Sequence, residues 1–160
     1  MHMKKIAVVD YFSQSKKWPP RIPKIKKITK NSLKIMKPYF EKNCLYYLNI
    51  VLSNQKIVSN LNKKFKKKYK DTDVLTFNNY IKNKKLGKIF YCDIFFSIDT
   101  IENFIEKNNT DFYNHFNHLL IHSLLHVNGY DHQTLNEYNK MRNQEMKILN
   151  KMGVELPYKI

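Results

Sequence analysis

Glycine, cysteine and acidic residues are all scarce in this chain of 160 residues, and long apolar runs are missing. Two cysteines, Cys44 and Cys92, are too few for a disulfide framework, which favours an intracellular protein. No segment reaches the roughly 18–20 apolar residues that a membrane-spanning helix needs. The first apolar run, residues 6–9, ends at Asp10 and is too short for a secretory signal. We therefore expect a cytoplasmic protein without a membrane anchor.

The composition predicts one folded domain spanning residues 1–160. Apolar residues make up 42% of the chain and aromatic residues 14%, which is too much for a disordered protein. A chain of this length can bury one sizeable core but is short for two domains.

Hydrophobic periodicity and helix-stop signals predict alternating strands and helices. The predicted strands cover residues 6–9, 45–52, 74–77 and 88–97, and a polar loop is expected between the last two. The predicted helices cover residues 25–36, 54–65, a short segment after Asp99, 111–127, and a last segment after Thr134. The predicted fold class is α+β: a mixed sheet of about four strands packed with helices, the C-terminal ones carrying a three-histidine site.

Several residues have the positions of helix caps. Asp99 and Glu102, like Thr134 and Glu137, have the spacing of a capping box. Thr110 is expected to cap the helix that follows it, and Gly129 stands where that helix needs a left-handed residue to end.

The positive charge is concentrated in the first half of the chain. Residues 1–88 contain 23 Lys and Arg against 4 Asp and Glu, a balance of +19, whereas residues 89–160 contain 6 against 9, a balance of −3. This asymmetry attracts polyanions, and nucleic acid is the abundant cytosolic one. A Lys-rich solvated surface would give the same composition, but Phe65 lies within the run of lysines at 63–68, and aromatic rings can stack on bases.

Five of the six histidines lie between residues 115 and 132. His122 and His126 are four residues apart, so a helix places both on one face. A turn containing Gly129 follows and can bring His132 back toward them. Three neutral imidazole ligands that leave one coordination position of the metal open are typical of a catalytic zinc site. We expect one zinc ion per chain. Nickel or copper could use the same ligands.

A zinc-bound water ionises near neutral pH, and zinc can also polarise a phosphoryl or carbonyl oxygen. Metalloproteases place a glutamate directly after the first histidine of their motif. Ser123 occupies that position and cannot act as that base. Because the chain is also basic, a phosphodiester substrate is favoured over a peptide.

The segment from His118 to His132, followed by Met141 and Glu145, resembles the YbeY family of bacterial rRNA maturation factors. Leu61-Asn62 with residues 72–77 resembles a second family signature, and Asp93-Ile94 a third. The resemblance extends over about residues 45–152. It implies a metal-dependent endoribonuclease of the bacterial cytoplasm that cuts single-stranded RNA, matures the 3′ end of small-subunit rRNA and acts in late ribosome quality control. The implied partners are therefore single-stranded RNA, rRNA and the small ribosomal subunit.

The resemblance also implies that His122, His126 and His132 are the zinc ligands. Lys66 stands where the family has a functional arginine, and is our candidate catalytic residue. Lysine keeps the charge but lacks the planar, bidentate grip of arginine on phosphate. Ser123 and Cys92 both replace a family glycine; the first change should be tolerated, and the second is expected to act as a small buried hydrophobe.

The remaining residues of the histidine region have structural alternatives. His115 is expected to be solvated, and His118 to contact a ligand or simply to pack. Asp131 can either orient a liganding imidazole or stabilise the turn. Met141 and Trp18 are expected in the core, and Thr72 and Asp73 at the start of a strand.

Two other functions remain open. The chain could be an RNA- or ribosome-binding module with a structural zinc, which requires a fourth protein ligand from Cys44, Cys92 or His118. A zinc metalloprotease is the third hypothesis, disfavoured by Ser123.

Overall fold

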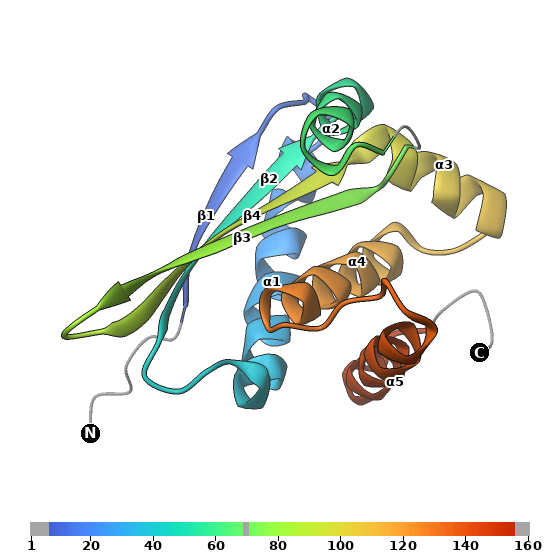
Figure 1. The fold of residues 1–160 in the computed structure, drawn as a ribbon. Coiled ribbons are helices and arrows are strands. Elements are labelled where there is room, and N and C mark those ends of the chain that lie inside the picture. The colour runs from blue at the N-terminus through green and yellow to red at the C-terminus, as the bar shows by residue number, and fades with distance from the viewer. Residues whose placement is uncertain (1–6, 69–70, 156–160) are drawn as a thin grey trace.

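Four strands form one mixed sheet in the computed structural model, which describes residues 7–68 and 71–155 (Figure 1). The strands are β1 (Ala7–Ser13), β2 (Leu45–Ser53), β3 (Val74–Asn83) and β4 (Gly87–Ser97), in the order β1-β2-β4-β3. β1, β2 and β4 are parallel, and β3 pairs antiparallel with β4 at the edge of the sheet.

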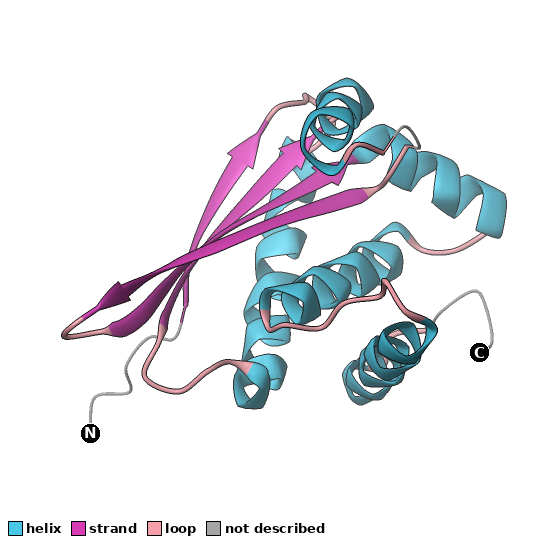
Figure 2. Cartoon of the chain, viewed as in Figure 1, coloured by secondary structure: helices cyan, strands magenta, loops and turns pink. Residues whose placement is uncertain are grey.

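Helices α1 (Ile22–Met36) and α4 (Phe112–Val127) lie along one face of this sheet (Figure 2). The other α-helices of the described residues are α2 (Gln55–Leu61), α3 (Ile98–Asn108) and α5 (Leu135–Met152). α1 and α4 lie beside the sheet, α5 packs against α4, and α2 sits at the end where β2 and β4 finish (Figure 1). The predicted α+β class with a four-stranded mixed sheet is confirmed.

The core lies between the sheet and α4. Alternate residues of β2 and β4 point toward the helices and are buried, among them Ile50, Cys92 and Ile94. Cys92 is therefore the small buried hydrophobe that we expected. Trp18 is also fully buried, and its indole N–H donates to the Ser53 carbonyl at 2.8 Å. No helix in the described ranges is both long and apolar enough to cross a membrane.

Two strands are longer than predicted. β1 continues to Ser13, and Ile6, the first residue of the predicted strand, lies outside the described residues. β3 continues to Asn83, so the polar loop expected after Phe77 is wrong. Residues 79–87 form the exposed end of the β3–β4 hairpin, where backbone pairing holds the strands although the side chains are not buried.

Two helices also differ from their predicted bounds. α1 begins at Ile22 rather than near residue 25, because Pro23 lies in the first turn, where a missing backbone N–H costs nothing. The helix predicted over residues 54–65 is α-helical only to Leu61. It continues as a single π-helical turn, Asn62–Lys66.

The N-terminal caps follow the prediction in one case and differ in two. Thr134 and Glu137 form the predicted capping box at the start of α5. The N-cap of α3 is Ser97, because the Asp99 carboxylate accepts the backbone N–H of Gln55 instead of capping its own helix. α4 is capped by Asp111 rather than by Thr110, with the carboxylate accepting the N–H groups of Tyr113 and Asn114.

Candidate metal centre

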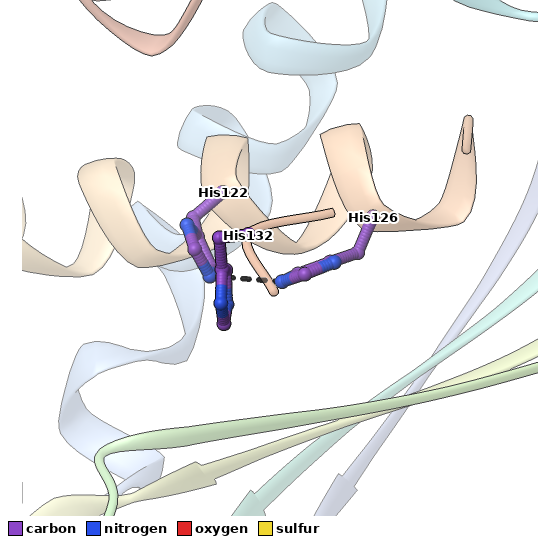
Figure 3. A group of neighbouring side chains, drawn as sticks. All are labelled: His122, His126 and His132. Carbon is purple, nitrogen blue, oxygen red and sulfur yellow. Dashed lines mark hydrogen bonds between the residues drawn. The ribbon is translucent and has the colours of Figure 1, made fainter. Parts of the chain in front are cut away.

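Helix α4 places His122 and His126 one turn apart on the same face. Most of the helix is buried, but these two rings remain partly exposed at its C-terminal end. Their Nε2 atoms lie 3.1 Å apart, and Figure 3 shows the two rings pointing toward each other. Asn78 of β3 donates its side-chain N–H to the Val127 carbonyl at 3.1 Å, so the site lies beside the edge strand.

The turn after α4 brings the third imidazole to this face. Asn128 caps the helix, and Gly129 follows with φ +93°, a left-handed conformation that favours glycine. The chain then reverses, and the His132 ring lies 5.3 Å from the His122 ring and 4.8 Å from the His126 ring, between centroids. One ligand nitrogen from each of the three histidines lies within 4.8 Å of the other two. The predicted convergence of His132 on the helix pair is confirmed as geometry.

A buried carboxylate from α5 orients the first of these rings. Glu145 is 3% exposed, and one of its oxygens accepts a hydrogen bond from Nδ1 of His122. Its other oxygen accepts from Nε2 of His118 at 3.0 Å. Burial by itself would raise the pKa of Glu145, but the hydrogen bonds from His118 and His122 outweigh it and lower the pKa to about 2. Glu145 is therefore a carboxylate that fixes the tautomer of His122 and leaves its Nε2 with a lone pair.

His126 is oriented by the backbone of the turn. Its Nδ1–H donates to the Tyr130 carbonyl at 2.9 Å, which leaves Nε2 with the lone pair. Burial, with smaller contributions from the neighbouring rings of His122 and His132, lowers the pKa of His126 to about 4. The ring is therefore neutral at pH 7, the form that binds a metal.

These tautomers create a place for a cation. The Nε2 atoms of His122 and His126 lie 3.1 Å apart, and when both rings carry their proton on Nδ1, both Nε2 lone pairs are available to one cation. Two imidazole ligands at the usual Zn–N distance and tetrahedral angle would be about 3.3 Å apart. The residues therefore fit a zinc ion in both donor chemistry and spacing.

The fourth ligand that a structural zinc would require is missing from this group. Within the described residues the potential ligands that converge here are only the three histidines. Burial raises the pKa of the Cys92 thiol to about 12, so the thiolate that zinc needs is disfavoured. Cys44 contacts Glu41 and Lys42, and His118 is held by Glu145.

Comparison with known proteins assigns this chain to a family. A family model described as Endoribonuclease YbeY matches residues 11–153. Two similar proteins named Endoribonuclease YbeY come from Ehrlichia canis, 36% identical over 89% of this chain and 92% of the relative, and Ehrlichia chaffeensis, 37% identical over 84% and 83%. The chain belongs to the YbeY endoribonuclease family. The predicted resemblance, and with it the enzyme class, is confirmed at the level of the family.

A solved structure supports the fold of this YbeY-family chain independently. The solution structure of a Thermotoga maritima protein superposes with a TM-score of 0.56, covering 96% of this chain and 97% of that protein. The two sequences are 18% identical, so this likeness concerns the fold alone.

His115 is not solvated as we predicted, but buried at 5% exposure. Its Nε2 lies 2.8 Å from a carboxylate oxygen of Asp73, and its ring stacks on Phe104 at 3.9 Å between centroids. Asp73 precedes β3, so this pair ties the YbeY signature at residues 72–77 to α4. Sequence reasoning missed the contact because the two residues are 42 positions apart.

Lys66 lies at the end of the π-helical turn. Its ammonium sits 5.2 Å from the centre of the Phe77 ring on β3. Lys66 is exposed, and in the described part of the chain it makes no hydrogen bond or ion pair with the three histidines.

Asp131 accepts the backbone N–H of His132 at 2.8 Å, which is the turn-stabilising alternative of the two roles expected for it.

Ser123, which replaces a glycine of the YbeY pattern, leaves a polar group unpaired. Its side chain is fully buried, and its hydroxyl has no hydrogen-bond partner in the described structure. Ser123→Ala should therefore raise the free energy of unfolding by about 1 kcal/mol, because it removes a desolvated hydroxyl and favours the helix. Urea denaturation measures the change.

The matched control is Ser53→Ala. Ser53 is equally buried, but its hydroxyl donates to Gln14 Oε1 at 2.6 Å, so its removal should lower stability. If both variants lose stability equally, the Ser123 hydroxyl is satisfied and this interpretation of the helix is wrong.

Proposed function

We propose that this chain is a zinc-dependent endoribonuclease that cuts single-stranded RNA, and that residues 1–160 form one such enzyme domain. We further propose that it acts in the cytoplasm on the small ribosomal subunit, maturing the 3′ end of its rRNA and serving late ribosome quality control. The observation that carries the proposal is the convergence of three imidazoles, with no fourth ligand among the described residues, in a chain of the YbeY family.

His122, His126 and His132 would hold one zinc ion. When bound, zinc would supply a Lewis acid and a water of lowered pKa. Hydrogen bonds within the chain preorganise this site for the metal. Glu145 and the Tyr130 carbonyl hold the Nε2 atoms of His122 and His126 toward each other. His132 closes the site from the turn and remains exposed.

The basic half of the chain would hold the RNA backbone. Lys66 is our candidate for a functional phosphate contact, because it is exposed and lies beside other exposed lysines of the π-helical turn. Each phosphate contact releases counterions, so RNA affinity should fall steeply as salt rises, by a slope of about 0.7 per contact on a double-logarithmic plot. Affinity that stays constant from low to physiological salt would show that the lysines only solvate the surface.

Cleavage assays test the activity itself. The zinc-loaded protein should cut a labelled single strand internally and leave the same strand uncut when it is annealed to its complement. A chelator should stop cleavage, and added zinc should restore it. Cleavage of casein with no cleavage of RNA would instead support the metalloprotease. RNA binding with zinc present but no cleavage would support the binding module.

A further inference from the structure

An exposed phenylalanine stands at the centre of the most basic segment of the chain. Phe65 is 58% exposed, although the spacing of Ile57, Leu61 and Phe65 places all three on one face of a continuous α-helix. The π-helical turn beginning at Asn62 inserts an extra residue and breaks this alignment. Phe65 is thereby moved off the half-buried face that carries Ile57 and Leu61. Single π turns of this kind occur often at functional sites.

The backbone holds this arrangement firmly. Lys67 ends the turn with φ +53°, a left-handed conformation uncommon outside glycine, and its N–H caps the Asn62 carbonyl. Lys68 donates its backbone N–H to the same carbonyl at 3.3 Å. Asn62 itself is buried at 3% exposure. The exposed ring is therefore carried on an anchored turn.

Phe65 begins a row of aromatic rings that runs onto the sheet. The rings of Phe65 and Phe77 lie 5.7 Å apart between centroids, and those of Phe77 and Phe95 lie 5.9 Å apart, both pairs nearly perpendicular. Such perpendicular contacts fix the position of the Phe65 ring beside β3. More than half of its surface remains open to a ligand.

Positive charge surrounds this ring. The Lys64 ammonium lies 5.2 Å from the centre of the Phe65 ring, and the Lys66 ammonium 5.2 Å from that of Phe77. Three further lysines of the segment are exposed: Lys63, Lys67 and Lys68. An open aromatic face among five cations matches a ligand that has both a flat π-system and repeated negative charge. Single-stranded RNA has both.

We propose that Phe65 is a stacking site for an unpaired base of RNA, with Lys64 and Lys66 contacting the adjoining phosphates. The inference rests on the proposed function for the identity of its ligand. It also fits the position of the candidate metal centre. Phe77 faces Phe65, whereas the next residue, Asn78, bonds to the end of α4 beside His126. A strand stacked on Phe65 could therefore cross the edge strand β3 toward the histidines.

Fluorescence anisotropy of the full-length protein with a short labelled single-stranded RNA tests the stacking site. It is measured in a chelator, which stops cleavage, and gel analysis confirms that the strand stays intact. Phe65→Leu should weaken binding roughly 5- to 100-fold, the range for loss of one stacked base. Phe65→Tyr should bind as the wild type does, because its ring is kept. Replacing the bases by abasic sites should remove the difference between Phe65→Leu and the wild type.

The matched control is Phe12→Leu. Phe12 is 51% exposed and lies on β1, the opposite edge strand, so it offers the same chemistry in another place. Its replacement should leave RNA affinity unchanged. The salt dependence separates the two kinds of contact: Lys66→Gln should lower the slope by about 0.7, whereas Phe65→Leu should not change it.

Equal affinity of Phe65→Leu and wild type would overturn the stacking site, as would equal losses for Phe65→Leu and Phe12→Leu. Neither result concerns cleavage, which is measured separately on the wild type. If the wild type binds through Phe65 but does not cut RNA, the proposed activity fails and the stacking site stands.

Discussion

The His126→Ala protein is expected to bind no zinc at stoichiometric concentrations and to lose cleavage of single-stranded RNA. Wild type should bind one ion per chain. Loss of a residue that only orients a ligand weakens metal binding about 10- to 100-fold, so loss of a ligand should cost at least about 100-fold. Elemental analysis of the dialysed proteins and a cleavage time course measure both effects.

His126→Ala is a decisive variant because the described residues offer no other converging ligand to replace His126. The group of converging ligands in the described residues contains three members, and removal of one leaves two. Gln133→Ala is the matched control, since Gln133 is exposed and directly follows His132. It should keep both zinc and activity. A His126→Ala protein that is folded by circular dichroism and still holds one zinc would exclude the three-histidine centre.

The candidate ligands could be predicted from sequence because their geometry is local. A four-residue spacing within a helix fixes the relation of His122 to His126, and a glycine turn directly afterwards permits only a short path to His132. The strands around the core were also predictable, because β2 and β4 are rich in β-branched and aromatic residues.

The residues around the ligands could not be placed in the same way. Glu145 and Asp73 reach α4 from 23 and 42 residues away, and periodicity carries no information at that separation. A signal for Glu145 does exist in the sequence. It stands between Met141 and Ile148 in the buried stripe of α5, where an acidic residue is stable only with a partner.

Local competition accounts for the other differences. Thr110 and Asp111 can both cap a helix, and the structure uses the carboxylate. The apolar spacing through Phe65 is that of an α-helix, and the π-helical turn takes the ring out of line with Ile57 and Leu61. A sequence pattern identifies which residues can share one face of a helix. It does not show where an inserted residue, as in a π-helical turn, breaks the helical spacing.

Glu145 is the residue outside the ligands whose change should affect the metal most. It joins α5 to α4 through two histidines, one of which is the candidate ligand His122. Its two oxygens each accept one imidazole N–H. In Glu145→Gln one of these positions becomes an NH₂ group, which faces an N–H donor, and the negative charge that favours the metal-bound imidazole is lost.

Glu145→Gln should therefore lower zinc affinity about 10- to 100-fold while leaving cleavage near the wild-type rate once zinc is saturating. Competition with a chromogenic chelator measures the affinity, and cleavage assays over a zinc series separate metal binding from turnover. Glu137→Gln is the matched control, because it makes the same change on the same helix at a capping-box position that accepts glutamine. It should keep wild-type affinity. If Glu145→Gln binds zinc as tightly as Glu137→Gln does, the carboxylate supports the packing of α5 on α4 without orienting His122 for the metal.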